Sequence, residues 1–309
     1  MTHFSFFRRL SCTILSVCAS IIVLKAQVKT LKVDPASTET NIKTVHGPHL
    51  AMYDPQVPSQ HKLILMIVGT GGSAEGSHTI DSIFATMGYH VVSLDYVNNV
   101  ITVVCSDSKD RGCFDHYRQE IMTGAPVSEK VQVDSANSIL NRFNELMRYL
   151  VKNDPDGGWN EFMRHGRPRW NRIIPAGHSQ GAGHAAYIGK LFKVDRVLLF
   201  SGPQDYLDNF QAPAGWQSQK GATPPSRYFA FLHLKDPFNV RHQLANCSKL
   251  METAKPDSIM IQQGAAVSGQ HHILITDIPT KDPHGSVLSP SFKDIWAYML
   301  TAPVSPFKN

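Results

Sequence analysis

The segment Gly-His-Ser-Gln-Gly at residues 177–181 contains the side chain best suited to nucleophilic chemistry. Ser179 follows an apolar segment of strand length, 171–177, and precedes a run of small residues, 180–192, that is typical of a helix. Glycines two positions before and two positions after the serine allow a tight strand-to-helix turn, in which larger side chains would collide. Such a turn exposes the hydroxyl and leaves the N–H of Gln180 free to bind an oxyanion. The pattern therefore predicts a serine nucleophile.

A serine hydroxyl needs a base, and the base needs an acid that orients it. C-terminal to this turn, Asp236 follows the predicted strand 226–234, and His284 lies in the loop after the last predicted strand. The alternative acid is Asp205, which follows the strand before that of Asp236. Asp236 precedes a proline, which favours a sharp turn that would aim its carboxylate over the sheet. We predict a Ser179–His284–Asp236 triad.

A second glycine-rich segment could complete an oxyanion hole. The apolar run 62–68 has the length of a buried strand and ends in Gly-Thr-Gly-Gly. Glycines let backbone approach a substrate closely. We expect the N–H of Thr70 to be the second oxyanion donor beside Gln180, with Gly71 as the alternative.

The elements that must position these residues alternate along the chain. Short apolar runs of strand length are separated by segments with helical spacing of apolar residues, which predicts an α/β fold with a mostly parallel central sheet and helices on both faces. The predicted strands are 62–68, 90–96, 171–177, 195–202, 226–234 and 271–278, and the predicted helices are 78–90, 134–153, 180–192, 239–252 and 289–301.

Three motifs of the sequence carry a resemblance to a known class of enzymes. The chain resembles the α/β-hydrolase fold superfamily over about residues 60–302, and within it a poorly characterised family of secreted bacterial serine esterase-like hydrolases. The motifs are GTGG at 69–72, GHSQGAGHA at 177–185 and SGPQD at 201–205. The SQGA portion is similar to cutinase-like esterases, but the acid and histidine are spaced differently. The resemblance implies a serine hydrolase that needs no cofactor and no metal.

The N-terminus has the layout of a secretory signal peptide. Residues 1–26 contain the pair Arg8 and Arg9, an apolar stretch over 10–24 and Ala26. This pattern predicts a secreted or periplasmic protein with no stable membrane association after the signal is removed. An uncleaved N-terminal anchor is the alternative.

The distribution of apolar runs divides the rest of the chain. Residues 27–60 are predicted to be an N-terminal extension with edge strands, and residues 61–309 the hydrolase domain. In segments 97–133 and 204–226 the apolar residues show no sustained helical or strand periodicity, so we predict that both are insertions. Ligands of such sheets bind over the carboxyl ends of the strands, so these insertions could contribute substrate-binding surface.

Charge does not favour nucleic acid as a partner. The formal net charge is +5, and it falls to +2 without residues 1–26, which hold three basic and no acidic residues. The remaining sequence has no uninterrupted run of Lys and Arg, so we predict no nucleic-acid binding.

The cysteines outside the signal segment favour one disulfide. Cys105 and Cys113 flank a polar segment that could form a small loop, and an oxidising compartment favours a bond between them. Two free thiols, or a bond from one of them to Cys247, are the alternatives. The chain has no Cys-x-x-Cys pair, so a thiolate metal site is not expected.

The predicted chemistry is hydrolysis of a carboxylic ester through an acyl-enzyme, with a small-molecule or polymeric ester as substrate. The same triad could act on an amide, a lactone, a thioester or a polyester, and a catalytically silent binding protein could use the same scaffold. Aromatic side chains in the two insertions could line a mixed apolar and polar substrate site or could hold the loops on the domain. They are Phe114, Tyr117, Tyr206, Phe210 and Trp216.

Overall fold

A computed structural model describes residues 1–2, 28–252, 258–261 and 266–304. The predicted signal peptide, residues 1–26, lies almost entirely outside these ranges. The described strands form a nine-stranded sheet in the order β1-β2-β4-β3-β7-β8-β11-β13-β12. Its strands are β1 (Lys29–Val33), β2 (His49–Tyr53), β3 (Leu63–Ile67), β4 (His90–Leu94), β7 (Ile173–His178), β8 (Val197–Phe200), β11 (Tyr228–His233), β12 (Ser258–Met260) and β13 (Ile273–Thr276).

Most of the sheet is parallel, as predicted. All neighbouring pairs from β4 to β12 in this order are parallel, whereas β2 is antiparallel to both β1 and β4. The sequence predicts edge strands for residues 27–60, but only β1 lies at the edge. All five residues of β2 are buried, because β2 is enclosed between β1 and β4.

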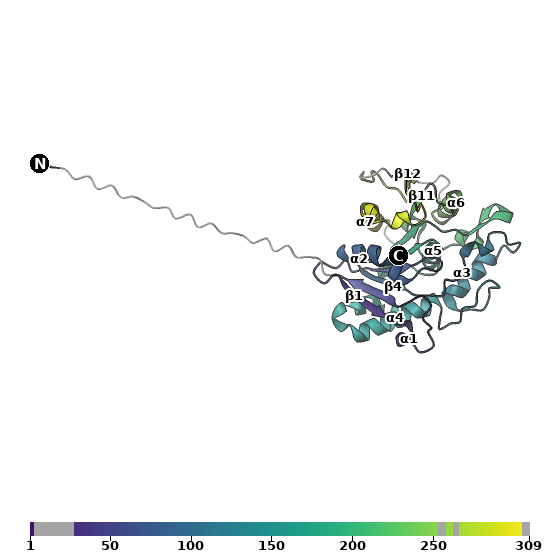
Figure 1. Ribbon diagram of the computed structural model, residues 1–309, viewed down its shortest axis with the longest axis horizontal. Helices are drawn as coiled ribbons and strands as arrows, with labels where there is room; N and C mark the ends of the chain where they lie inside the picture. Colours follow the sequence, from purple (N-terminus) through teal and green to yellow (C-terminus); the bar gives the residue numbers. More distant parts are fainter. Residues whose placement is uncertain (3–27, 253–257, 262–265, 305–309) are drawn as a thin grey trace.

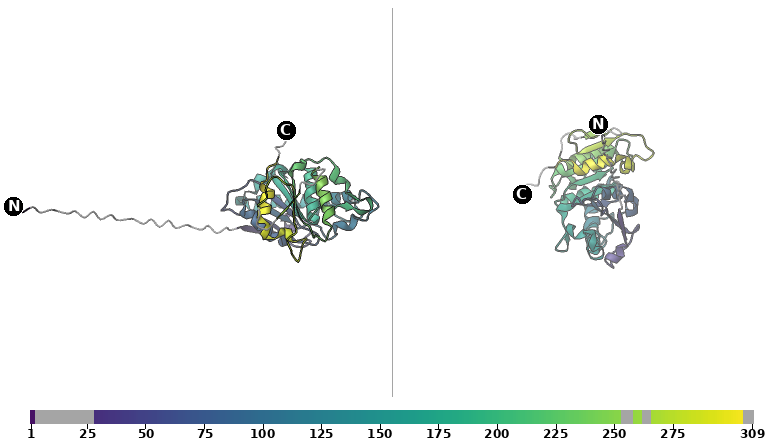
Figure 2. Two further views of the ribbon diagram at one scale, coloured as in Figure 1. Left: turned by 90° about the horizontal axis from the view of Figure 1, so that it is seen from above. Right: turned by 90° about the vertical axis from the view of Figure 1, so that its left-hand side faces the viewer.

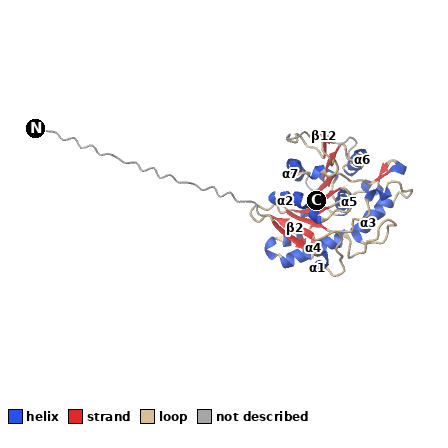
Figure 3. Ribbon diagram, in the orientation of Figure 1, coloured by secondary structure: helices blue, strands red, loops and turns tan. Residues whose placement is uncertain are grey.

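Helices cover both faces of the sheet (Figure 1 and Figure 3). Alternate residues of β3 contribute to two separate apolar clusters, Leu63, Leu65 and Ile67 to one and Ile64 and Met66 to the other. The first cluster includes residues of α3 (Cys113–Thr123), α4 (Ile139–Asn153), α5 (Gln180–Leu191) and α6 (Val240–Leu250), and the second includes residues of α2 (His78–Thr86) and α7 (Lys293–Thr301). The views in Figure 2 show the same layers.

Several short elements lie outside the central sheet and the helices that cover it. They are the one-turn helix α1 (Pro35–Thr38), the two-residue strand pair β5 (Met163–Arg164) and β6 (Arg167–Pro168), and the pair β9 (Tyr206–Leu207) and β10 (Ala212–Pro213), besides short 3₁₀ turns.

The segment 97–133 contains a helix that the sequence analysis did not predict. Helix α3 buries Phe114, Tyr117 and Ile121, which have helical spacing. It also buries Arg118 and Glu120, and these charged residues obscure the apolar period in the sequence. Glu120 accepts hydrogen bonds from three backbone N–H groups between residues 127 and 133, so it organises the loop after the helix.

The structure joins Cys105 and Cys113 in a disulfide, as predicted. Their Cα atoms are 5.6 Å apart. Cys247 is buried and free, and burial raises the pKa of its thiol to about 12. The bond ties the start of α3 to the 3₁₀ turn at Thr102–Cys105.

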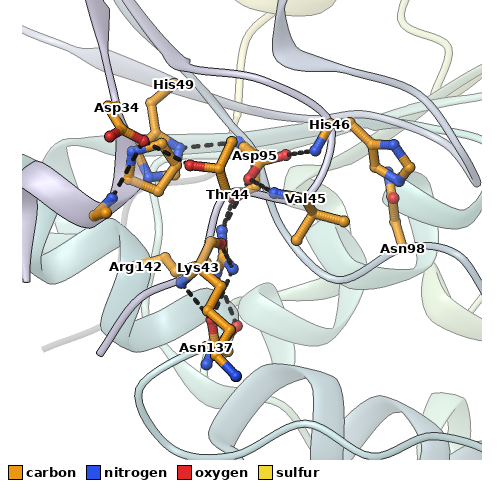
Figure 4. A network of polar contacts seen from close by, with 12 residues as sticks. Asp34, Lys43, Thr44, Val45, His46, His49, Asp95, Asn98, Asn137 and Arg142 are labelled. Atoms are coloured by element: carbon orange, nitrogen blue, oxygen red, sulfur yellow. Dashed lines mark hydrogen bonds and ion pairs between the residues drawn. The ribbon is translucent and has the colours of Figure 1, made fainter. Parts of the chain in front are cut away.

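A buried polar network fixes the N-terminal segment to the domain (Figure 4). Arg142 on α4 forms an ion pair with Asp95, which follows β4, and also donates to the carbonyl oxygen of Lys43. Asp95 accepts hydrogen bonds from the backbone N–H groups of Val45 and His46. Each charge of the pair is compensated by several partners, which a buried pair requires. Residues 43–46 are therefore fixed to the domain through their backbone groups, although their side chains are exposed or half-buried.

His49 belongs to the same network and must be neutral. Its Nδ1 accepts the backbone N–H of Asp95 at 2.9 Å, and its side chain is fully buried. Burial and the nearby positive charge of Arg142 lower the pKa of His49 to about 3. Between pH 3 and about 6.5 the unfolded chain binds a proton that the folded protein excludes, so stability is lost as the pH falls through this window.

We predict that His49→Asn removes part of this acid sensitivity, because an amide oxygen can accept the same N–H without titrating. Urea unfolding at pH 7.5 and pH 5.0 measures the effect. The wild-type protein should lose about 2 kcal/mol more than the variant between the two pH values. Equal losses in both proteins would show that His49 is not held neutral in the folded state.

Candidate active site

Ser179 lies in the turn between β7 and α5, with φ 57° and ψ −122°. Positive φ is unfavourable for serine, and packing on both sides holds it there. A Cβ on Gly177 would lie 2.1 Å from the carbonyl oxygen of Gly181, and a Cβ on Gly181 would lie 1.9 Å from that of Ile67. Both positions therefore exclude every residue with a side chain. The two glycines of the motif are there for backbone contact, as the sequence predicts.

The Gly-Thr-Gly-Gly loop rests directly on this turn. It follows β3, which is the neighbour of β7 in the sheet. A Cβ on Gly69 would come within 3.0 Å of the Cβ of Ser179, so a larger residue would push the loop away. The parallel pairing of the two strands thus brings the two glycine-rich motifs together.

His284 and Asp236 are hydrogen-bonded to each other. Asp236 follows β11, His284 lies in the loop after β13, and the two strands are neighbours. The distance from His284 Nδ1 to Asp236 Oδ2 is 2.8 Å. The other carboxylate oxygen accepts the backbone N–H of Phe238 at 2.8 Å. Burial raises the pKa of Asp236, but the hydrogen bond and charge of His284 and the Phe238 N–H outweigh it, and the net pKa is lowered. The carboxylate is therefore ionised and can orient the imidazole.

The backbone of His284 is held by two side chains. Its carbonyl oxygen accepts hydrogen bonds from His178 Nε2 at 2.9 Å and from Ser201 Oγ at 2.7 Å. Burial, followed by the neighbouring His284, lowers the pKa of His178 to about 4. His178 is therefore neutral near pH 7 and carries its proton on the nitrogen that faces the carbonyl.

Ser179 and His284 line one cavity, but Ser179 Oγ is hydrogen-bonded to Gln204. Gln204 Nε2 donates to Ser179 Oγ at 3.3 Å, and within the described residues no hydrogen bond joins Ser179 to His284. Catalytic hydrogen bonds are often long without a bound substrate and shorten in the complex. Gln204 belongs to the Ser-Gly-Pro-Gln-Asp motif after β8.

The backbone donors beside Ser179 differ in their availability. The Gly71 N–H donates to the carbonyl oxygen of Asn98 at 3.1 Å, which leaves it unable to bind a substrate oxygen. The N–H groups of Thr70 and Gln180 have no acceptor among the described residues. The Thr70 hydroxyl donates to the side-chain oxygen of Gln180, which links the two loops. The geometry therefore favours Thr70 over Gly71 as the second oxyanion donor.

Asn98 holds the whole Gly-Thr-Gly-Gly loop. Its side-chain amide donates to the carbonyl oxygens of Gly69 and Gly72, at 2.9 and 2.8 Å. Its backbone carbonyl oxygen accepts a hydrogen bond from the Gly71 N–H. Asn98 is 1% exposed, so these bonds are shielded from water.

Asp205, the alternative acid, is directed elsewhere. Its carboxylate accepts hydrogen bonds from Nε and Nη2 of Arg118, at 2.9 and 2.6 Å. It also accepts one from Nε1 of Trp216, at 2.9 Å. Arg118 also donates to the carbonyl oxygen of Gln180 at 2.8 Å. All of these side chains are buried. Asp205 therefore supports the first turn of α5 through Arg118. Within the described residues it makes no hydrogen bond with His284.

The cavity at Ser179 has a volume of about 420 Å³ and an uncharged wall. The described residues that line it include no Asp, Glu, Lys or Arg. They are Met66, Val68, Gly69, Thr70, Gly72, Ser73, Gly76, Ser77, Ile101, His178, Ser179, Phe238, His284 and Leu288.

The aromatic residues of the insertions do not line this cavity. Phe114, Tyr117 and Trp216 are buried in the core. Tyr206 stacks on His242, with ring centroids 3.8 Å apart, and the Phe210 ring lies 3.9 Å from the Arg111 guanidinium carbon. These side chains hold the loops on the domain, and Ile101 alone brings an insertion to the cavity wall.

The strand order, with antiparallel β2 and the serine turn after β7, decides the architecture. This chain has the α/β-hydrolase fold. No family model matches the chain, and comparison with curated proteins finds no match.

Three solved structures illustrate the likeness. A putative dienelactone hydrolase from Klebsiella pneumoniae is 12% identical, with a TM-score of 0.45, covering 89% of this chain and 97% of that one. A hyperthermophilic esterase from Pyrobaculum calidifontis is 13% identical, with a TM-score of 0.42, covering 89% and 81%. A bacterial heroin esterase is 11% identical, with a TM-score of 0.45, covering 92% and 85%.

Neither a metal cluster nor a membrane span occurs in the described part of the chain. Among the described residues no cluster of three or more His, Cys, Asp or Glu side chains could hold a metal ion. In the same part of the chain no helix has the length and apolar character needed to cross a bilayer.

Sequence reasoning missed three residues that support the site. Gln204 and Ser201 lie in the Ser-Gly-Pro-Gln-Asp motif, but their contacts with Ser179 and His284 depend on loop geometry. Asn98 lies in a polar stretch after β4, and no local pattern distinguishes it from Asn99.

We predict that Asn98→Ala lowers kcat on the expected ester substrates by about 10- to 100-fold with a smaller change in KM, because the displaced loop misplaces an oxyanion donor. Steady-state kinetics on a p-nitrophenyl ester measure both constants. Asn99→Ala is the matched control, since Asn99 is exposed, and its activity should be unchanged. Equal activity of the two variants would refute the role of Asn98.

Proposed function

We propose that this protein is a serine hydrolase that cleaves carboxylic esters. The observation that carries the proposal is one cavity that contains Ser179 at a strained strand-to-helix turn and His284 with its Nδ1 hydrogen-bonded to Asp236. The nucleophile, the base and the orienting acid thus come from three neighbouring regions at the carboxyl edge of the sheet.

In the proposed reaction His284 Nε2 removes the Ser179 proton as Oγ attacks the ester carbonyl carbon. Asp236 keeps the Nδ1 proton in place and stabilises the imidazolium that forms. The N–H groups of Thr70 and Gln180 bind the oxyanion. His284 then gives its proton to the leaving alcohol, and water, activated by the same imidazole, hydrolyses the acyl-enzyme. This chemistry requires no metal and no cofactor.

The cavity favours small uncharged esters. Its apolar residues would contact an alkyl or aryl group, and its serine hydroxyls can meet polar uncharged atoms. A carboxylate on the substrate would lose its hydration without gaining a cationic partner. We therefore propose neutral esters of small acids or alcohols as the substrate class.

Export of the protein is part of the proposal. The Arg-Arg pair and apolar stretch in residues 1–26 support it, and so does the Cys105–Cys113 bond, because disulfides persist in oxidising compartments.

We predict that Ser179→Ala abolishes turnover of p-nitrophenyl butyrate, with a loss on the order of 10⁴-fold or more, because loss of a triad nucleophile is that costly. The circular dichroism spectrum should be unchanged. Ser218→Ala, at an exposed serine away from the cavity, is the control and should keep full activity. More than a tenth of the activity left in Ser179→Ala would contradict the assignment.

A second prediction concerns substrate charge. For p-nitrophenyl butyrate and mono-p-nitrophenyl succinate, which have acyl chains of equal length, we expect kcat/KM to be about 100-fold higher for the neutral ester, because the carboxylate is desolvated unpaired. Leu288→Lys should narrow this ratio by placing a cation in the cavity wall. A ratio near one in the wild-type protein would overturn the proposed substrate class while leaving ester hydrolysis intact.

A further inference from the structure

A cluster of arginines surrounds the β5–β6 hairpin, far from the proposed active site. Arg164, Arg167 and Arg169 lie within six residues of sequence, and Arg172 follows. Other residues separate them, so they form no uninterrupted basic run in the sequence. The hairpin precedes the amino end of β7, whereas Ser179 follows its carboxyl end, so the two sites are separated by the length of a six-residue strand, about 20 Å.

The hairpin places two positive charges opposite each other. Arg164 pairs with Arg167 in the antiparallel register, and the turn between them is formed by His165 and Gly166, both with positive φ. Like charges directly across a strand pair destabilise it. Both arginines are exposed, and neither side chain makes a hydrogen bond or ion pair with any other described residue. The fold therefore keeps an unfavourable pair that an anion would neutralise.

Nearby acidic groups are already engaged. Glu145 pairs with Arg148, and Glu161 pairs with Arg172 and His61. Arg148 also donates from Nε and Nη2 to the carbonyl oxygen of Gly166, which adds a further guanidinium under the turn. The positive charge of the hairpin is thus left without a carboxylate from the described part of the protein.

The hairpin also borders a depression with a volume of about 540 Å³. Its wall contains Arg164, Arg167, Arg169 and His165, with Pro168 and Trp170 as the ring-bearing surface. The Trp170 ring is fixed by stacking on Phe192, with centroids 4.2 Å apart. This volume falls in the range of small-molecule sites, and is larger than a single ion needs.

We propose that this arginine hairpin binds an acidic polysaccharide, with sugar rings over Pro168 and Trp170 and their anionic groups on the guanidinium groups. Guanidinium forks match carboxylate and sulfate oxygens in a bidentate way. A lipid surface fits less well, since the tip, His165–Gly166, carries no apolar side chain to insert. Binding here leaves the cavity at Ser179 open, so the protein can be held on a polymer while it hydrolyses an ester.

The test measures binding of the full chain to dextran sulfate and to alginate, with unsubstituted dextran as the neutral polymer. We expect binding to the two acidic polymers and none to dextran. Arg164→Gln with Arg167→Gln should weaken binding at least tenfold. The control, Lys109→Gln with Lys220→Gln, removes the same charge from two other exposed sites and should change binding less than twofold. Hydrolysis of p-nitrophenyl butyrate should be unaffected by both pairs of substitutions.

A charge reversal separates binding from folding. Arg164→Glu creates an opposite-charge pair with Arg167, so it should raise the Tm by about 1–2 °C while it weakens binding to dextran sulfate at least tenfold. Equal binding by wild type and Arg164→Gln/Arg167→Gln, or an equal loss in the lysine control, would overturn the proposal. Tighter binding to duplex DNA than to dextran sulfate would overturn the assignment to a polysaccharide.

Discussion

Close contact between backbone segments at the β7–α5 turn determines the geometry of the candidate active site. Gly177 meets Gly181 across the turn, and Gly181 meets the end of β3, so neither can carry a side chain. The turn holds Ser179 in a conformation that costs a serine of order 1–3 kcal/mol, which the surrounding packing must offset. The turn places the Ser179 hydroxyl at the start of α5, beside the Gln180 N–H, which has no acceptor among the described residues.

The neighbouring segments support this turn through buried polar contacts. Arg118 and Asp205 form a fully buried ion pair, and Arg118 also binds the Gln180 carbonyl oxygen at the start of α5. Removing one partner would leave an uncompensated charge in the core, so the pair holds α3 and α5 in one arrangement. Asn98 does the same for the glycine loop after β3. The insertion 97–133 therefore contributes chiefly to support of the site.

Much of this arrangement could be predicted from the sequence, because it rests on local patterns. Apolar runs identify β3, β7 and β11, and the glycine spacing identifies the turn at Ser179. The order of the elements brings Asp236 and His284 together, and the structure places them 2.8 Å apart. We propose the catalytic roles of these residues on the basis of that geometry.

The remaining features depend on contacts between distant segments. Helix α3 was missed because its buried face includes Arg118 and Glu120, whose partners lie elsewhere in the chain. The sequence gives no sign that Asn98 faces three glycines whereas Asn99 faces solvent. Similarly, the aromatic residues of the insertions have the composition of a substrate site, but Trp216 packs inward because Asp205 accepts its indole N–H.

The proposed mechanism requires that His284, oriented by Asp236, activates Ser179. Reaction with a fluorophosphonate probe, followed by peptide mass spectrometry, tests it without knowledge of the substrate. We expect one labelled residue, Ser179. Labelling should be slowed at least 100-fold in Asp236→Asn and little changed in Asp107→Asn, the matching substitution of an exposed aspartate. Labelling at another residue, or equal labelling rates in wild type and Asp236→Asn, would show that Ser179 is not activated by this His–Asp pair.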